Sequence, residues 1–469
     1  MAKNEKKEVI VIGAGPGGYA AAFRAADLGL KVCLIDPEVN PGGVCLYRGC
    51  IPSKALLHLA KVKREAEAAA EWGLKFGNPE VDLKKMIAWK TQVVEKLTGG
   101  LGQLSKSKKI EYIKGEARFL SKNELEVKEE GGKTSKRSFE HAIIATGSYI
   151  AGLPGIELDH KKIIDSTDAL EIEELPKKLL VIGGGYIGLE LGSFFAAMGS
   201  KVSVAEMTPG FLPGADRDLV KILENAELFE NTWFETKVEK ASVEKSKVKV
   251  SLKNEEGTQE KTFDKVLVAV GRKPDSASFD PEKAGIETDD KGFIRVDLQR
   301  RTNIKNIYAI GDLTGEPLLA HKATHEGRVA AEVIAGEPGA AYDVKAIPGI
   351  VFTDPELAWT GLTQTEAKEK GMKVKLLKFP WRASGRAVSI AAENGLTKLI
   401  VDPDSGRILG GGVAGKNAGS LIPEITLAIE MAATAEDLAL TIHPHPTLSE
   451  TLMEAAESFS ATPTHFSSK

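Results

Sequence analysis

The sequence has few cysteines, little excess charge and no long apolar run, and each shortage excludes a class of protein. Only three cysteines, Cys33, Cys45 and Cys50, occur in 469 residues. They are too few for a disulfide scaffold or for a zinc site built from cysteines. The formal net charge is −4, with lysine and arginine spread along the chain, so we predict no binding to nucleic acid or anionic membrane. No apolar run approaches the roughly 20 residues that cross a bilayer, and the apolar stretch at 408–415 predicts a strand at most.

The N-terminal eight residues are charged and include acids. They resemble neither a signal peptide nor an Arg- and Ser-rich transit sequence. We therefore predict a cytoplasmic protein, and a transit peptide removed ahead of residue 1 stays an open alternative. The chain is long enough for about three domains of roughly 100–200 residues each. With 42% hydrophobic residues and 47 glycines, it can build large cores and many tight turns.

A nucleotide-binding pattern begins near the N-terminus. An apolar run at 9–12 is followed by Gly13-Ala-Gly15-Pro-Gly-Gly18, an Ala-rich helical stretch, and a second apolar run that ends in Asp36. The first glycine allows a tight turn, the second lets backbone approach a pyrophosphate, and the third lets helix and strand pack closely. Asp36 is placed to accept hydrogen bonds from a ribose.

The same pattern occurs a second time. An apolar run at 179–182 precedes Gly183-Gly-Gly185-Tyr-Ile-Gly188, and Glu206 lies at the same offset from its first glycine as Asp36 does. One such glycine motif is a weak signal, but strand, motif, helix, strand and acid repeated in register are strong. A carboxylate such as Glu206 suits a free 2′-hydroxyl and repels a 2′-phosphate, which favours NAD over NADP.

Each copy continues into charged, alternating strands that end in an apolar run and a glycine. The first copy ends at Thr146-Gly147 and the second at Gly271. We interpret this as a duplicated module, which predicts two nucleotides, one bound permanently and one exchanged. A third apolar strand ends in Gly311-Asp312, ahead of a predicted helix over 320–334. An N-capping aspartate is the plain alternative for that segment.

Cys45 and Cys50 form a pair, whereas Cys33 lies in an apolar strand and is predicted to be a buried, inert thiol. Pro52 favours the first turn of a helix, and residues 55–70 have helical composition. Cys50 then lies near a helix N-terminus, whose partial positive charge lowers the pKa of a thiol. Four intervening residues can bring the two sulfurs to bonding distance. In a chain without other disulfides, this pair is more typical of catalysis than of structure.

Thiol chemistry needs a proton acceptor, and histidine suits neutral pH. His443 and His445 are flanked by prolines that stiffen the backbone, and Glu450 is placed to orient an imidazole. From the residues alone, a metal-binding role and a purely structural role for the two histidines stay open.

Taken together, these segments resemble the pyridine nucleotide–disulfide oxidoreductase family from residue 9 to residue 458. The resemblance implies an α/β fold with two Rossmann-like nucleotide-binding domains, for FAD and NAD, and a C-terminal α+β dimerisation domain. The implied parts are the FAD-binding domain (first part, 1–148), the NAD-binding domain (149–271), the central or FAD-binding domain (second part, 272–345) and the dimerisation domain (346–469).

The resemblance also implies site residues, and it places no metal among them. The implied catalytic residues are Cys45, Cys50, His445, Glu450, Lys54 and Glu190. The implied FAD-binding residues are Gly13, Gly15, Gly18, Asp36, Lys54, Thr146, Gly147, Gly311 and Asp312. The implied NAD-binding residues are Gly183, Gly185, Gly188, Glu206 and Gly271.

Within the family, the chain is most similar to members that oxidise protein-bound dihydrolipoamide with NAD+. The implied partners are a second copy, in a homodimer with shared active sites, and the lipoyl domain of an acyltransferase or of the glycine cleavage carrier protein. No cysteine follows Cys50, unlike in mercuric and large thioredoxin reductases, and Glu206 disfavours the NADP use of a glutathione reductase. An interaction subunit that holds FAD only as structure is the non-enzymatic alternative.

The chain departs from the family pattern at four positions. Tyr47 stands in the cysteine segment where asparagine is usual, Asp36 replaces the commoner glutamate, and Ile150 replaces a proline. Tyr186 resembles the tyrosine that covers the flavin in glutathione reductases. None of these departures removes a reacting group.

Overall fold

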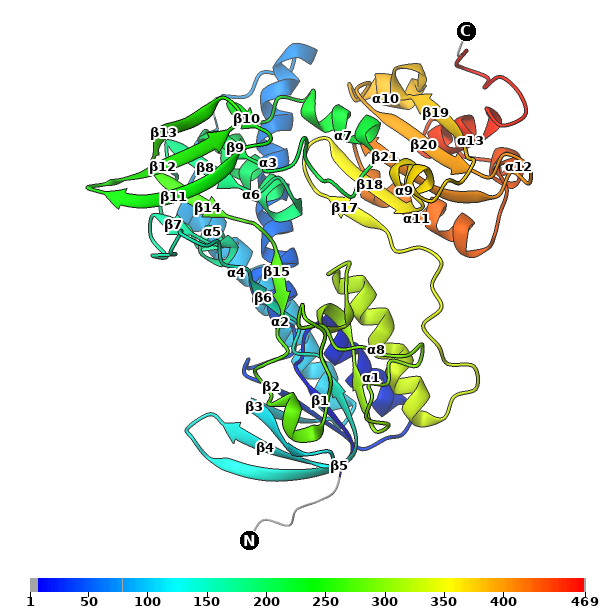
Figure 1. Cartoon of the computed structure of the whole chain (residues 1–469). Helices are drawn as coiled ribbons and strands as arrows, with labels where there is room; N and C mark the ends of the chain where they lie inside the picture. Colours follow the sequence, from blue (N-terminus) through cyan, green and yellow to red (C-terminus); the bar gives the residue numbers. More distant parts are fainter. Residues whose placement is uncertain (1–6, 78, 468–469) are drawn as a thin grey trace. The chain divides into compact units, whose positions relative to one another are not determined.

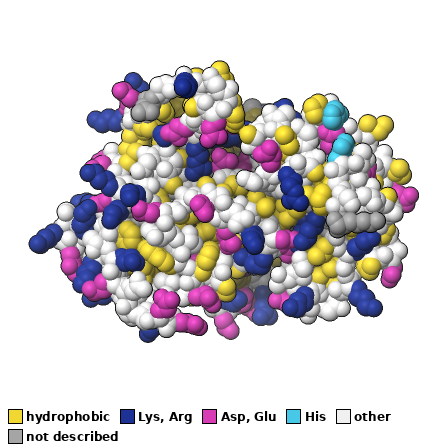
Figure 2. Space-filling view, turned by 90° about the horizontal axis from the view of Figure 1, so that it is seen from above, with side chains coloured by type: hydrophobic (Ala, Val, Ile, Leu, Met, Phe, Trp, Pro, Cys, Tyr) yellow, Lys and Arg dark blue, Asp and Glu magenta, His cyan; other side chains and the backbone are white. Residues whose placement is uncertain are grey.

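The computed structural model describes residues 7–77 and 79–467, which form two compact units. The first unit takes the chain up to Ala55, together with Leu83–Ala151 and Gly271–Asp343. The second takes Leu56–Asp82, Gly152–Val270 and the chain from Val344 onward. Within the described residues, no helix combines the length and the apolar character that crossing a membrane requires. Figure 2 shows acidic and basic side chains interspersed over the face that it draws.

The first unit is built on a parallel sheet that grows into an antiparallel extension. Parallel pairing gives the order β3–β2–β1–β5–β16, and β4 pairs antiparallel with the far parts of β3 and β5. The strands in the middle of this sheet are apolar on both faces, as expected where helices or loops cover both sides. The strands are β1 (Lys7–Ile12), β2 (Val32–Asp36), β3 (Glu111–Ser121), β4 (Glu124–Glu129), β5 (Thr134–Ile144) and β16 (Ile307–Ala309).

Helices α1 (Pro16–Asp27) and α8 (Ala320–Ala335) lie side by side in this unit (Figure 1). Their close approach depends on glycine, because a Cβ at Gly327 would overlap the carbonyl oxygen of Gly17. The first unit also contains α2 (Gly43–Arg48), the start of α3 (Cys50–Ala68), α4 (Leu83–Ser107), β6 (Ser148–Ile150), β15 (Arg272–Pro274) and the 3-10 helices η2 (Pro281–Ala284) and η3 (Gly311–Thr314).

The second unit contains another parallel sheet, with the order β10–β9–β8–β14–β7, and a three-stranded antiparallel sheet, β11–β12–β13. Its strands are β7 (Ile163–Ile164), β8 (Lys178–Ile182), β9 (Lys201–Ala205), β10 (Asn231–Trp233), β11 (Lys237–Glu244), β12 (Lys247–Asn254), β13 (Gly257–Phe263) and β14 (Lys265–Val268). Its helices in this part are η1 (Ala69–Trp72), α5 (Ser166–Leu170), α6 (Tyr186–Ala197) and α7 (Arg217–Glu224).

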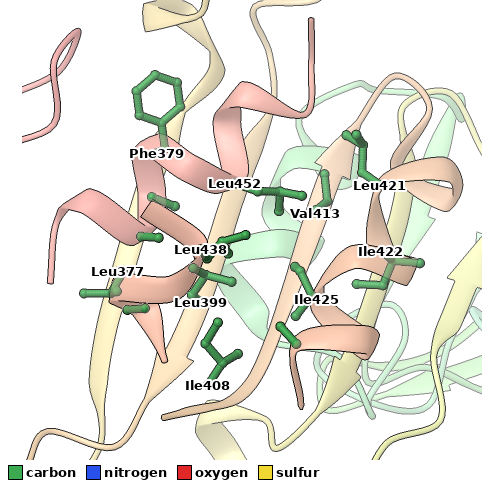
Figure 3. Close-up of a cluster of buried hydrophobic side chains, with 14 of the residues drawn as sticks. Leu377, Phe379, Leu399, Ile408, Val413, Leu421, Ile422, Ile425, Leu438 and Leu452 are labelled. Atoms are coloured by element: carbon green, nitrogen blue, oxygen red, sulfur yellow. The ribbon is translucent and has the colours of Figure 1, made fainter. Parts of the chain in front are cut away.

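The C-terminal part of the second unit is an antiparallel sheet, β17–β18–β21–β20–β19, packed against helices. Figure 3 shows Leu399, Val413, Ile425 and Leu452 from this sheet and its helices meeting in one buried cluster. The strands are β17 (Gly349–Val351), β18 (Glu356–Gly361), β19 (Lys375–Pro380), β20 (Leu396–Val401) and β21 (Ile408–Gly415). The helices are α9 (Gln364–Glu369), η4 (Trp381–Ala383), α10 (Gly385–Ser389), α11 (Ala418–Glu430), α12 (Ala435–Leu440) and α13 (Glu450–Glu457).

The predicted fold class is confirmed: two nucleotide-binding α/β sheets and a C-terminal α+β part are present. The strand at 408–415 and the helix from residue 320 are where the sequence predicts them. Cys33 is fully buried in β2. The predicted helix start near Cys50 is also confirmed, since α3 begins at Cys50. Pro52 falls in its first turn, where the missing N–H would have no partner in any case.

A buried lysine joins two parts of the second unit. Lys398 of β20 is 0% exposed, and its Nζ lies 2.8 Å from Asp216 Oδ2 and 3.0 Å from Asp218 Oδ1. These aspartates lie just before and within α7, while β20 belongs to the C-terminal sheet. Gln364 Oε1 accepts a further hydrogen bond from Lys398, at 2.9 Å. The ammonium therefore fixes α7, which follows the second nucleotide-binding motif, on the C-terminal sheet.

Replacing Lys398 with methionine leaves the buried Asp216 carboxylate without its cation, whereas Asp218 keeps its ion pair with Lys378. Because removing one partner of a buried ion pair costs about 3–5 kcal/mol, we expect the free energy of unfolding in urea to fall by that amount. Lys378→Met is the matched control, since its ion pair with Asp218 has a lysine that is 41% exposed, and exposed pairs contribute about 0–1 kcal/mol. Equal urea midpoints for Lys398→Met and the wild type would contradict this assignment.

Candidate functional site

The first glycine motif connects β1 to α1 with the geometry of a phosphate-binding turn. Gly13 has a φ of 95°, which favours glycine, and a Cβ at Gly18 would overlap the carbonyl oxygen of Gly13. At Gly15, by contrast, no atom of the described residues lies within 4 Å of the Cβ position. The Ala14 amide donates to Asp36 Oδ2 at 2.6 Å. The motif thus has tight packing at its first and third glycines and open space at its second.

The second motif, between β8 and α6, repeats this geometry. Gly183 has a φ of 110°, a Cβ at Gly188 would overlap the carbonyl oxygen of Gly183, and among the described residues nothing lies within 4 Å of the Cβ position at Gly185. Glu206 Oε2 accepts from the Gly184 amide at 2.6 Å. In both motifs the free space lies beside the N-terminus of a helix, which suits a dinucleotide pyrophosphate. The residues therefore fit the predicted nucleotides.

Thr208 holds the other oxygen of the Glu206 carboxylate. Glu206 Oε1 accepts from the Thr208 amide at 2.7 Å and from Thr208 Oγ1 at 2.8 Å. The sequence reasoning did not single out Thr208, although its position two residues after the acid is the usual spacing of a local side-chain-to-backbone turn. The carboxylate is therefore fixed at the end of β9.

The Gly311-Asp312 segment is held by a relay of side chains in the first unit. Arg272 Nε donates to Ser148 Oγ at 2.7 Å, and Ser148 Oγ donates to Asp312 Oδ2 at 2.5 Å. Ser148 directly follows Thr146-Gly147, and Thr146 Oγ1 donates to the carbonyl oxygen of Asp275 at 2.8 Å. The structure thus brings together the predicted residues at the ends of β5 and β16. Gly271, at the start of the last segment of this unit, accepts from the Ala151 amide at 3.0 Å.

Glu326 in α8 is a further residue of this site that is not predicted from the sequence. This carboxylate is fully buried, accepts from the Gly311 amide at 2.6 Å, and pairs with Arg300 at 3.0 Å and with Lys322 at 3.3 Å. It fixes the turn that carries Asp312. In the sequence, a glutamate in a helix is indistinguishable from a solvated charge, so no local signal identifies it.

Cys45 lies within the short helix α2, and Cys50 is the first residue of α3. Both are thiols in the structure. A hydrogen bond with the Cys50 side chain, together with burial, raises the pKa of Cys45, and the charge of Lys54 acts in the opposite direction. The proton therefore stays on Cys45. Cys50 lies at a helix N-terminus, where a thiolate is favoured.

Lys54 and Glu190 belong to different units, and their expected pairing stays a prediction. Lys54 lies one turn after Cys50 in α3 and acts electrostatically on Cys45. Glu190 is buried in α6 and its Oε1 accepts from the Phe352 amide at 3.1 Å. The bond ties α6, which carries the second glycine motif, to the residue that follows β17.

His445 and His443 have different surroundings. His445 Nδ1 lies 2.8 Å from Glu450 Oε1, and its side chain is 71% exposed. His443 is nearly buried, with Nε2 2.7 Å from Glu424 Oε1 and Nδ1 2.8 Å from the carbonyl oxygen of Thr441. The second Glu450 oxygen accepts from the Thr447 amide at 2.7 Å. Burial acts to raise the pKa of Glu450, but the Thr447 and His445 hydrogen bonds lower it overall, so the carboxylate is ionised at neutral pH.

Comparison with known proteins places these features in one family. Residues 7–327 match the family model described as pyridine nucleotide-disulphide oxidoreductase. Residues 347–456 match the dimerisation domain of the same family, so the chain forms a homodimer.

Several relatives and solved structures resemble the chain over nearly its whole length. Dihydrolipoyl dehydrogenases from Vibrio cholerae and Haemophilus influenzae are each 49% identical and cover 98% of this chain, with 97% and 96% of their own length matched. The crystal structure of LpdA from Mycobacterium tuberculosis has a TM-score of 0.90 at 25% identity and covers 97% of this chain and 100% of its own. The flavoprotein disulfide reductase RclA from Escherichia coli, in a Cu(II) complex, has a TM-score of 0.86 at 29% identity, covering 97% and 99%. Since the two family models together span both units and the relatives share about half of their residues with it, the chain belongs to the pyridine nucleotide-disulphide oxidoreductase family.

Proposed function

We propose that the chain is a dihydrolipoyl dehydrogenase, which oxidises protein-bound dihydrolipoamide to lipoamide and reduces NAD+ to NADH. One observation carries this proposal: a cysteine pair, Cys45 in α2 and Cys50 at the start of α3, in a chain that is 49% identical over 98% of its length to an enzyme of that name. Steady-state NADH formation from dihydrolipoamide tests it. Turnover of glutathione disulfide with NADPH, in place of this activity, would move the chain to another branch of the family.

The chain is an NAD-dependent flavin disulfide oxidoreductase, and its cofactors are FAD and NAD. We assign FAD to the motif of Gly13, Gly15 and Gly18, with Asp36 at the ribose and Asp312 at the ribityl chain. The remaining FAD residues are Lys54, Thr146, Gly147 and Gly311. We assign NAD to Gly183, Gly185, Gly188, Glu206 and Gly271. Bound FAD would take the electron pair of the enzyme dithiol, and NAD+ would accept it as hydride to become NADH. The open space beside Gly15 and Gly185 supports both assignments.

The exchange with the substrate is a thiol–disulfide reaction. A lipoyl thiolate attacks the Cys45 sulfur of the oxidised pair, forming a mixed disulfide and releasing Cys50 as a thiolate. The second lipoyl thiol then attacks the first lipoyl sulfur, closing the lipoyl disulfide and releasing Cys45. The position of Cys50 at the start of α3, where a thiolate is favoured, and the raised pKa of Cys45 support these roles.

His445 is the proton acceptor in this proposal. Its Nδ1 contacts the ionised Glu450, which leaves Nε2 to take the proton of the incoming thiol and to return it to Cys45. The side chain is exposed on the chain that carries it, in the part that matches the dimerisation domain. We therefore propose that each pair of cysteines works with His445 of the partner subunit. Lys54 and Glu190 complete the proposed catalytic set.

The proposed organisation follows the division into 1–148, 149–271, 272–345 and 346–469. The proposed partners are lipoyl domains of an acyltransferase in a 2-oxo acid dehydrogenase complex, or of the glycine cleavage carrier protein, and the proposed location is the cytoplasm. In this proposal the lipoyl group is attached to a lysine of the partner chain, which brings the substrate to the cysteine pair.

Cys45→Ser and Cys50→Ser are each expected to abolish dihydrolipoamide oxidation, because a hydroxyl cannot form the disulfide. Cys33→Ala is the matched control, since this thiol is buried within β2 and should not alter turnover. The measurement is NADH formation under saturating dihydrolipoamide. Turnover at the wild-type rate in either serine variant would rule out the exchange described above.

His445→Gln is expected to lower kcat by a factor of about 10²–10⁴, which is the usual contribution of a positioned general base. His465→Gln is the control: His465 also contacts a glutamate, Glu454, and its side chain is 59% exposed, but it has no proposed role. The rates are compared at equal FAD content. If both variants lost the same small fraction of activity, His445 would have no special place in proton transfer.

Glu206→Gln is expected to lower the preference for NAD+ over NADP+ by at least about tenfold in kcat/KM, because placing like charges together costs several kcal/mol. Glutamine has one acceptor oxygen where glutamate has two, so it keeps either the Gly184 bond or the Thr208 bonds. Glu230→Gln, which removes an exposed carboxylate paired with Lys201 at 2.9 Å, serves as control. An unchanged ratio in Glu206→Gln would mean that another residue selects the nucleotide.

A further inference from the structure

Two side chains in the cysteine segment reach back to the segment that follows β2. Tyr47 Oη donates to the carbonyl oxygen of Asn40 at 3.0 Å, and the Arg48 guanidinium pairs with the Glu38 carboxylate. Both residues belong to α2, which contains Cys45 and ends just before Cys50. From the family resemblance, an asparagine is expected at position 47. The bond to Asn40 shows what the tyrosine contacts there.

The segment at 38–40 is itself tied to the proposed FAD site. The Glu38 amide donates to Asp36 Oδ1 at 2.9 Å, and Asp36 Oδ2 accepts from the Ala14 amide at 2.6 Å. The hydroxyl of Tyr112 donates to the carbonyl oxygen of Glu38 at 2.9 Å. These bonds fix the backbone to which Tyr47 and Arg48 attach.

The contacts close into a ring. The Gly42 amide, one residue before α2, donates to the carbonyl oxygen of Ala14 at 2.8 Å. From Gly42 the path runs through α2 to Tyr47 and Arg48, then through residues 38–40 to Asp36, and back to Ala14. The first turn of the glycine motif and the cysteine segment are thus parts of one hydrogen-bonded structure.

The charges of the ring act on Asp36 in opposite directions. The pKa of Asp36 is raised overall, mainly by burial and also by the nearby Glu38 carboxylate, while the amides of Ala14 and Glu38 and the charge of Arg48 act to lower it. Arg48 pairs with Glu38 and so neutralises a charge that works against Asp36. The guanidinium of the cysteine segment therefore supports the ionised carboxylate at the ribose position.

We propose that Tyr47 and Arg48 are positioning residues that hold the redox-active helix α2 on the FAD-ribose segment, and that this anchoring stabilises the Cys45–Cys50 disulfide. The proposal rests on the proposed function. A fixed α2 keeps Cys45 close to Cys50 and so raises the effective concentration of one sulfur at the other. Without the anchors, the oxidised pair is reduced more easily and FAD is held less tightly.

The test uses the FAD-loaded Tyr47→Phe/Arg48→Met double variant, without NAD. The protein is equilibrated anaerobically with mixtures of reduced and oxidised dithiothreitol, in which the reagent dithiol reduces the enzyme disulfide and itself closes to a disulfide. Trapping the thiols by alkylation, followed by mass spectrometry, gives the dithiol fraction of Cys45 and Cys50. We expect the equilibrium to shift about tenfold toward the enzyme dithiol, which is about 30 mV for a two-electron couple. FAD release, followed by flavin fluorescence on dilution, should increase severalfold.

Two further variants separate anchoring from general stability. Arg48→Lys keeps a cation for Glu38. Its disulfide equilibrium and FAD release should therefore stay close to the wild-type values, unlike those of Arg48→Met. Arg24→Met breaks another ion pair of the same unit, Arg24–Glu332 at 2.8 Å, whose exposure (34% and 23%) is close to that of Arg48–Glu38 (37% and 26%). It should leave both the disulfide equilibrium and FAD release at their wild-type values.

A double variant with the wild-type disulfide equilibrium overturns the proposal, even if its unfolding temperature has fallen, because the residues are then merely structural. A shift of equal size in Arg24→Met also overturns it. A wild-type pair that never exchanges with dithiothreitol overturns the proposed function itself, and the anchoring role with it.

Discussion

Both nucleotide-binding parts depend on the same short hydrogen bond. A carboxylate at the end of the second parallel strand accepts from the amide that follows the first glycine, Asp36 from Ala14 and Glu206 from Gly184, at 2.6 Å in each case. The bond joins the end of one strand to the turn that leaves its neighbour, so the carboxylate and the helix N-terminus face the same space. A negative charge and a cluster of amide donors then stand at opposite parts of one site, matching a ribose and a pyrophosphate.

The parts of the fold that the sequence predicted are those with local signals. Glycines at Gly13 and Gly183 need positive φ, and buried parallel strands read as apolar runs. Pro52 indicated a helix start beside Cys50, and α3 begins there. The contacts that the sequence could not predict join residues far apart in the chain, as Lys398 joins Asp216 and Glu326 joins Gly311. In the sequence, a charged residue that is buried and paired cannot be distinguished from one that is exposed to solvent.

Departures from the family pattern show a further limit of sequence reasoning. Tyr47 in place of asparagine left the hydrogen bonding of the cysteine segment open. The structure gives its hydroxyl a backbone carbonyl at Asn40, and no side-chain pattern encodes such a partner. Ser148, beside the predicted Thr146-Gly147, is a similar case. It links Arg272 to Asp312, and these residues come together only because β5 pairs with β16.

The imidazole of His445 is exposed on the chain that carries it, and the proposed active site draws on two chains. This arrangement has a genetic consequence. A chain that folds and dimerises but has lost both Cys45 and His445 disables its own site and also the site of its wild-type partner. In a cell that makes equal amounts of both chains, three quarters of the dimers would contain such a chain if pairing is random. Such an allele would therefore leave only a quarter of the dimers active, whereas an allele that prevents folding would leave half of the chains, all of them in active dimers.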